Sequence, residues 1–173
     1  MESFRTGAVP SATPGSQLHG IEEDIACAAG SDVPVLITCP DRDSRESIAR
    51  AIHAQSSRHA KAFIIVRCTG PRQPLLETDL FGDGKAHVTG SESGAIARAQ
   101  GGTILLDEVD ELSLPVQAVL DQFLDTQHVP SMMTMDVRVI TGSGRPLIER
   151  VLTHEFSEHL FYRLNIIHVH AAR

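Results

Sequence analysis

The chain has 173 residues, 42% of them hydrophobic and 21% charged, and a formal net charge of −7. This length and usage suit one globular domain, and the negative charge without a basic run argues against a surface that binds nucleic acid directly. No apolar stretch approaches the ~18 residues of a membrane helix or forms a signal sequence, so we expect a cytoplasmic protein without membrane contact.

Residues 1–15 contain Pro10, Pro14 and small residues, so we expect a flexible lead over 1–15 and one domain over 16–173. Apolar spacings of three and four predict helices, and short aliphatic runs predict strands. Residues 83–94 contain three glycines and predict a surface loop. In chain order the predicted elements are helix 17–29, strand 33–38, helix 44–55, strand 63–66, helix 75–81, strand 103–106, helix 114–124, strand 137–140 and strand 166–169.

This alternation of strands and helices predicts an α/β fold in which helices cover both faces of a parallel sheet. Ligands of such sheets bind at the carboxyl ends of the strands. The predicted strand at 103–106 is followed by Asp107 and Glu108, so it delivers two carboxylates to that edge. In a P-loop ATPase the first such acid helps to hold Mg²⁺ and the second can polarise the attacking water.

Several segments resemble a known family in their order and approximate spacing. The sequence reads Glu-Thr-Asp-Leu-Phe-Gly at 77–82, Gly-Gly-Thr-Ile-Leu-Leu-Asp-Glu at 101–108, Asp-Val-Arg-Val-Ile at 136–140 and Phe-Tyr-Arg-Leu-Asn at 161–165. Together they resemble the central AAA+ domain of bacterial sigma-54-dependent transcription activators, the enhancer-binding proteins. The resemblance implies a three-layer P-loop NTPase core with a mostly parallel five-stranded sheet, and an ATPase ring that remodels RNA polymerase carrying sigma-54.

The family's phosphate-binding loop is altered in this chain. Cys39, Arg42 and Ser44 stand where the family has glycines, and Arg45 stands at the position of the phosphate-contacting lysine, while Glu46 agrees with the family. Glycines let successive backbone N–H groups turn toward phosphates, which side chains here would obstruct. The resemblance therefore assigns Arg45, Glu46 and Ser143 to a degenerate nucleotide site, with Ser143 at the sensor position.

Other functional positions of the family also carry different residues in this chain. Arg67 stands where an asparagine positions the catalytic glutamate, and we hypothesise that Arg67 pairs with Glu108 instead. Of two arginines directed at a neighbouring subunit, the first is Ser157 and only Arg163 remains. Arg163 is a candidate intersubunit arginine, or a helix-end arginine that pairs with Glu155 or Glu158.

The sigma-contacting loop of the family corresponds to residues 86–91 of this chain. Its apolar tip, a phenylalanine in the family, is Val88, and it is followed by Thr89 and Gly90. The family's helical lid and its DNA-binding helix-turn-helix would follow the last predicted strand. Because the sequence given ends at Arg173, we expect a domain without the lid and without an element for DNA recognition.

These substitutions predict a domain that regulates transcription through protein contacts without ATP hydrolysis, with Asp107 and Glu108 as vestigial Walker B residues and no bound cofactor. Its expected partners are related AAA+ activators or a second copy of the chain. One alternative is a divergent ATPase that binds Mg-ATP through Arg45, Asp107 and Glu108, with Asp107 at the metal. Another is a regulator that reaches DNA only through a partner.

Overall fold

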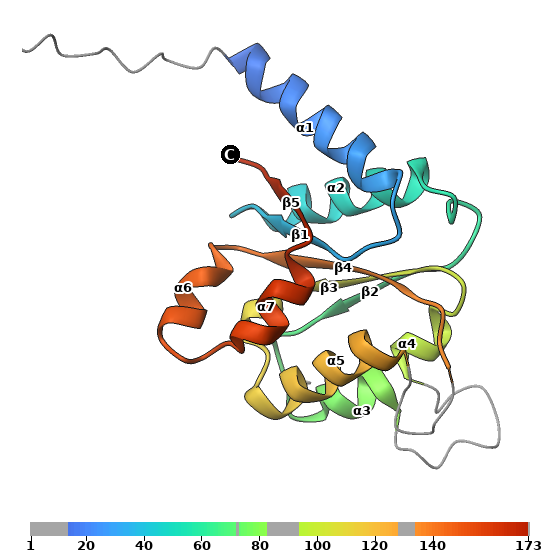
Figure 1. The fold of residues 1–173 in the computed structure, drawn as a ribbon, viewed down its shortest axis with the longest axis vertical. Coiled ribbons are helices and arrows are strands. Elements are labelled where there is room, and N and C mark those ends of the chain that lie inside the picture. Colours follow the sequence, from blue (N-terminus) through green and yellow to red (C-terminus); the bar gives the residue numbers. More distant parts are fainter. Residues whose placement is uncertain (1–13, 72, 83–93, 128–133, 173) are drawn as a thin grey trace, which may run out of the picture.

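A computed structural model describes residues 14–71, 73–82, 94–127 and 134–172 of the chain. Over these ranges five strands form one sheet in the order β2-β3-β4-β1-β5, and every neighbouring pair is parallel. The predicted α/β architecture is confirmed (Figure 1). The strands are β1 (Val35–Thr38), β2 (Phe63–Arg67), β3 (Thr103–Asp107), β4 (Arg138–Ser143) and β5 (Ile167–His170).

The helices lie in two layers, one on each face of the sheet (Figure 1). One layer contains α1 and α2, and the other contains α3, α4, α5 and α7. The helical elements are α1 (Pro14–Ala29), α2 (Arg42–Gln55), η1 (Gln73–Leu75), α3 (Leu76–Phe81), α4 (Ala95–Arg98), η2 (Val109–Glu111), α5 (Leu114–Thr126), α6 (Leu147–Leu152) and α7 (Glu158–Leu164).

The alternation of side chains along β1 shows how the sheet separates two apolar cores. Val35 and Ile37 pack with α1 and α2, whereas Leu36 packs with the helices of the opposite layer. All three are 1% exposed or less, because β1 lies between β4 and β5 and is covered on both faces. Among the described strands, β2 and β5 are the outer ones and each pairs on one side only.

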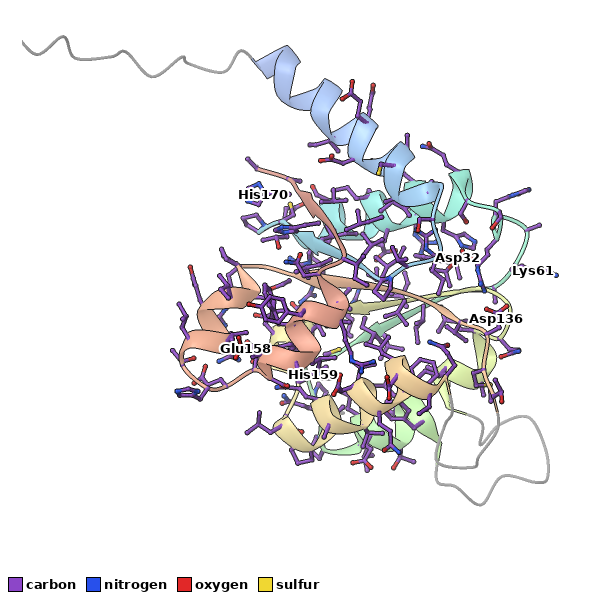
Figure 2. All side chains as sticks on the ribbon, in the orientation of Figure 1. Asp32, Lys61, Asp136, Glu158, His159 and His170 are labelled. Atoms are coloured by element: carbon purple, nitrogen blue, oxygen red, sulfur yellow. The ribbon has the colours of Figure 1, made fainter. Side chains whose placement is uncertain are left out.

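The edge of the sheet where the strands begin is joined by ion pairs. Figure 2 shows Asp32, Lys61 and Asp136 gathered on that side, away from His170 at the end of β5. Arg58 donates to Asp32 at 3.1 and 3.2 Å and to Asp136 at 2.7 Å. These pairs link the segment before β1 to the segment before β4.

All five strands were predicted, with boundaries that differ from the structure by three residues or fewer. The short helices α4, α6 and α7 were not among the predicted elements. Residues 1–13 of the expected lead lie outside the described ranges, and Pro14 already begins α1. No helix in the described part of the chain is long and apolar enough to cross a membrane.

Candidate functional site

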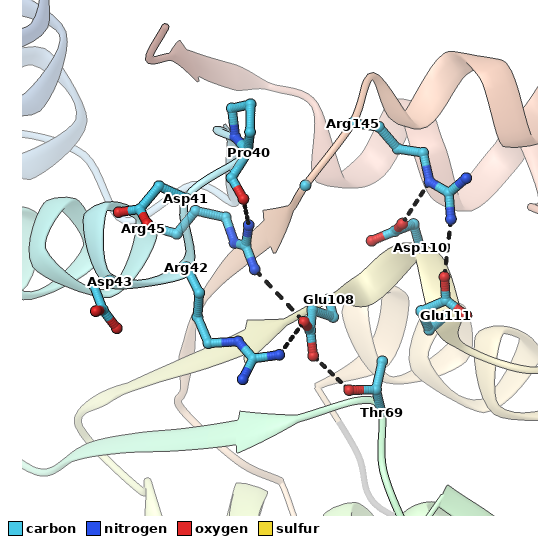
Figure 3. Close-up of a pocket in the computed structure, with 11 residues that line it drawn as sticks. Pro40, Asp41, Arg42, Asp43, Arg45, Thr69, Glu108, Asp110, Glu111 and Arg145 are labelled. Carbon is cyan, nitrogen blue, oxygen red and sulfur yellow. Dashed lines mark hydrogen bonds and ion pairs between the residues drawn. The ribbon is translucent and has the colours of Figure 1, made fainter. Parts of the chain in front are cut away.

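A pocket of about 660 Å³ opens at the carboxyl edge of the sheet, where ligands of parallel α/β sheets bind (Figure 3). The loop after β1, the start of α2, η2 and the turn after β4 form its walls. Of the site residues predicted from sequence, Arg45 and Glu108 line it. The full lining is Pro40, Asp41, Arg42, Asp43, Arg45, Thr69, Glu108, Asp110, Glu111, Gly144 and Arg145.

Arg45 lies in the wall of the pocket and is buried against the sheet. Its side chain is 2% exposed, and it forms a two-point ion pair with the carboxylate of Asp107, which is itself 4% exposed. The Nε group donates to Asp107 Oδ1 at 2.6 Å and Nη2 donates to Oδ2 at 3.2 Å. Each oxygen of the carboxylate predicted to hold Mg²⁺ thus accepts a hydrogen bond from a permanent cation.

The loop after β1 turns carbonyl oxygens toward this arginine. Arg45 Nη1 donates to the carbonyl of Cys39 at 2.7 Å and to that of Pro40 at 3.3 Å. At the start of α2, Asp41 Oδ2 accepts from the Ser44 backbone N–H at 2.8 Å and from its hydroxyl at 2.6 Å. A phosphate site needs free N–H groups at this helix N-terminus. Here the carboxylate of Asp41 caps the helix and accepts from one of these N–H groups, that of Ser44.

Gly142 provides the space in which the Arg45–Asp107 pair lies. It is opposite Asp107 in the β3–β4 register. A Cβ atom at Gly142 would lie 2.6 Å from Asp107 Oδ1 and 3.2 Å from Arg45 Cδ. The next residue, Ser143, is fully buried and donates its hydroxyl to the carbonyl of Arg145 at 2.6 Å. The predicted sensor hydroxyl is therefore used within the turn after β4.

Glu108 turns sharply out of β3. Its backbone is left-handed, with φ 60° and ψ 44°, an uncommon conformation for a residue other than glycine. Its carboxylate accepts from Arg42 Nη2 and from the hydroxyl of Thr69. Burial raises the pKa of Glu108, but the hydrogen bonds from Thr69 and Arg42 oppose burial and the net pKa is lowered. Glu108 is held as a carboxylate by two neighbouring donors.

The hypothesised pair between Arg67 and Glu108 is wrong. No ion pair within 4.0 Å joins these two side chains, which both lie in the described part of the chain, and Arg67 is exposed at the end of β2. Because Glu108 leaves the strand in a left-handed turn, its carboxylate meets Thr69, two residues beyond Arg67, together with Arg42. Neither partner was predicted from the sequence.

The role of Thr69 can be tested by replacing it with valine, which keeps the shape and removes the hydroxyl donor. The pKa of Glu108 is expected to rise toward its ordinary value, since one of the groups that lowers it is lost. A depressed carboxylate pKa stabilises the fold above the unfolded-state pKa, and this stabilisation is lost as the pH falls through the folded-state pKa. Thr69→Val should therefore cost about 1 kcal/mol at pH 7 and less in acid.

The measurements are a ¹³C-carboxyl NMR titration of Glu108 and urea unfolding at pH 7 and pH 3. Thr153→Val is a matched control, because Thr153 donates to Glu155 on an exposed surface. A Glu108 pKa that is the same in Thr69→Val and in the unaltered chain would show that the hydroxyl does not hold this carboxylate.

Two other predicted site residues point elsewhere. Glu46 accepts from Arg50 at 2.7 and 3.0 Å, one turn along α2, and does not line the pocket. Arg163 lies in α7 and pairs with Asp121 at 3.1 Å and Asp125 at 2.8 Å. The prediction that Arg163 pairs with Glu155 or Glu158 was wrong. Both acids of the observed pairs belong to α5, which packs beside α7, so the pairing depends on tertiary structure.

Three charged residues of the pocket were missed by the sequence analysis. Arg145 Nε donates to Asp110 Oδ2 at 3.2 Å, and its Nη2 donates to Glu111 at 3.0 Å. The acidic run that continues beyond Glu108 was the available signal for Asp110 and Glu111. Among the residues that the structure describes, no group of three or more His, Cys, Asp or Glu is arranged to hold a metal ion. The predicted sigma-contact residues Val88, Thr89 and Gly90 lie outside the described ranges.

Comparison with known proteins agrees with this architecture. The Sigma-54 interaction domain family matches residues 13–170. The regulatory protein AtoC of Escherichia coli is 37% identical over 175 residues, which cover 96% of this chain and 38% of AtoC. Crystalline NtrX from Brucella abortus in complex with ADP has a TM-score of 0.79 and 29% identity, covering 90% of this chain and 36% of NtrX.

The P-loop NTPase domain of an Escherichia coli sigma-54 activator has a TM-score of 0.69 over 94% of this chain and 99% of that domain, and at 18% identity it supports the fold alone. The chain spans little more than a third of the length of AtoC and NtrX. The match to the family extends over nearly all of the described residues. This chain belongs to the Sigma-54 interaction domain family.

Proposed function

We propose that this domain takes part in sigma-54-dependent transcription regulation through protein contacts and does not hydrolyse ATP. The observation that carries the proposal is the buried Arg45–Asp107 pair, which lies where a P-loop ATPase would hold phosphate and Mg²⁺. Its partners would be related activators of the same family or a second copy of the chain. The fold keeps its strands and cores, since packing does not depend on the residues that differ at the phosphate loop.

The electrostatics of the pocket support this proposal. Its lining contains five carboxylates and three guanidinium groups, which gives a formal charge of −2. Two of the carboxylates, Asp41 and Asp43, lie at the start of α2, where the triphosphate of a nucleotide would have to approach. Like charges at such short range repel by several kcal/mol at an intermediate dielectric constant. Arg42 and Arg145 do not offset this repulsion of a triphosphate, because each already binds carboxylates of the pocket.

Nucleotide titration tests the proposal directly. Isothermal titration of the purified chain with ATP and Mg²⁺ is expected to show no binding tighter than about 1 mM. Phosphate release should be equal for the unaltered chain and Glu108→Gln. NtrX from Brucella abortus is a suitable positive control, since it has been solved in complex with ATP and with ADP. Micromolar binding, together with turnover that disappears in Glu108→Gln, would contradict the proposal.

A divergent ATPase is the second candidate function. It is favoured by the positions of Asp107, the last residue of β3, and of Glu108, which follows it and lines a pocket of about 660 Å³. In that case nucleotide binding would have to displace Arg45 from Asp107 and expose the guanidinium to the phosphates. The same titration distinguishes the two candidates, because only the ATPase gives binding and turnover that depends on Glu108.

A further inference from the structure

We propose that the outer edge of β2, the side on which this strand pairs with no other described strand, binds an extended acidic segment of a protein partner as an added strand. This contact lies outside the pocket at the carboxyl edge and does not depend on whether that pocket binds nucleotide. Three features of the described residues support it: backbone groups that point outward, an apolar sequence that leaves the edge unguarded, and exposed cations without ion pairs.

Alternate residues of β2 turn their backbone groups away from the sheet. The Thr103 N–H, at the start of β3, donates to the carbonyl of Ala62 at 2.9 Å. Because bonded positions alternate along each strand of a parallel pair, the even-numbered residues of β2 face β3. The N–H and C=O groups of Phe63, Ile65 and Arg67 therefore point to the outer side. They form no hydrogen bond with any described residue there.

The side chains of β2 do little to protect this edge. Natural sheets guard an outer strand with charged residues, with proline or with a bulge. Residues 63–66 read Phe-Ile-Ile-Val, and their register with β3 runs without a bulge. All four of these side chains are partly exposed, whereas the five residues of β3 are buried. A strand added beside β2 would cover apolar surface that the fold leaves accessible.

Exposed cations without ion pairs lie along β2. Most arginines in the described ranges pair with a carboxylate within 4.0 Å. The exposed lysine and arginines of these ranges that do not are Lys61, Arg67 and Arg98. Lys61 comes just before β2, Arg67 ends it, and Arg98 ends α4, which lies against β2. In a chain of formal net charge −7, this local excess of positive charge favours an acidic partner.

The same cations decide between possible occupants of the edge. Two copies of the chain that joined their β2 edges would bring the cations of one copy close to those of the other, and like charges across a strand pair are destabilising. An acidic segment would instead place carboxylates near Lys61 and Arg67. Its backbone would bond to the outward groups of β2, and in this mode of recognition main-chain hydrogen bonds supply affinity while side chains supply specificity.

NMR titration of the ¹⁵N-labelled chain with the peptide Ac-Glu-Val-Thr-Val-Thr-Val-Glu-NH₂ tests this inference. The expected dissociation constant is on the order of 1 mM. The amide proton signals of Phe63, Ile65 and Arg67 should move downfield, because these N–H groups gain a hydrogen bond. They should move more than those of Ile64 and Val66, which already bond to β3. Exchange of the three outward amides with solvent should slow about tenfold at about 10 mM peptide.

Two altered peptides and two variants separate strand addition from attraction of charge. A peptide with glutamine at both ends should bind about threefold more weakly. The acidic peptide N-methylated at every valine and threonine should not bind, since it lacks the backbone donors and its methyl groups block the edge. Arg67→Gln should weaken binding of the acidic peptide about threefold. Arg163→Gln removes the same charge from α7 and should bind the peptide as the unaltered chain does.

Equal binding of the N-methylated peptide would exclude strand pairing, and equal binding of a peptide with lysine at both ends would exclude recognition of acids; either result overturns the inference. The same shifts on concentrating the chain alone would identify a second copy as the occupant, and the same shifts with oligothymidylate would identify nucleic acid. Unchanged spectra at about 10 mM peptide would remove the site. The proposed function depends on the nucleotide titration instead, so the two failures are distinguishable.

Discussion

Replacement of Arg45 by methionine is expected to lower the free energy of unfolding by about 3–5 kcal/mol. Methionine keeps much of the apolar volume of the arginine stem, so the main loss is the guanidinium group. Asp107 would then lie at 4% exposure without the two hydrogen bonds that it accepts from Arg45. The carbonyls of Cys39 and Pro40 would lose the same donor. Urea unfolding followed by circular dichroism measures the change.

The matched control is Arg42→Met, which removes a neighbouring guanidinium that is 45% exposed. Because exposed ion pairs contribute little, it should cost no more than about 1 kcal/mol. A double variant, Arg45→Met with Asp107→Leu, should recover at least half of the loss, since apolar replacement of both members of a buried pair is often neutral. If Arg45→Met were no more destabilising than Arg42→Met, the pair would not hold this edge of the sheet together.

The ion pair that Arg45 forms could not be predicted from the sequence. The resemblance places Arg45 at the lysine position and predicts poor phosphate binding there, and both statements stay predictions. Its actual partner, Asp107, lies 62 residues away and meets it only when β1 and β3 are aligned on either side of β4. Whether an arginine contacts a ligand or a carboxylate of its own chain depends on that tertiary arrangement. The sequence analysis named both residues without pairing them.

The strands were predictable for a physical reason that does not extend to the short helices. Buried parallel strands are continuous aliphatic runs, and such runs stand out locally. Helices α4 and α6 have only four and six residues, too few to show a periodic apolar face. They form where tertiary packing holds them, as at Leu147, which is 1% exposed in α6. The partners of Glu108 were unpredictable for a related reason, since a left-handed turn redirects its side chain.

Replacement of Gly102 by alanine is expected to destabilise the fold by about 3 kcal/mol or more, since the clash involves backbone atoms that cannot rotate away. A Cβ atom at Gly102 would lie 2.2 Å from the carbonyl oxygen of Ala62. That oxygen accepts from the Thr103 N–H at 2.9 Å, so it marks the first contact between β2 and β3. If Ala62 and Gly102 moved apart to relieve the clash, this hydrogen bond would break and the first residues of β2 and β3 would be disturbed. Urea unfolding gives the magnitude.

Two other glycines provide controls for this variant. Gly101→Ala meets no atom within 4 Å but stands at φ +71°, so it should cost about 1 kcal/mol of backbone strain. Gly20→Ala lies in open space within α1 and should be neutral or stabilising by up to about 1 kcal/mol. If Gly101→Ala and Gly102→Ala lowered the free energy of unfolding equally, backbone strain would explain both losses and contact with Ala62 would not. The expected order of stabilities would indicate that the Gly-Gly-Thr motif, one of those by which the sequence resembles the family, is required here for strand packing whether or not nucleotide binds.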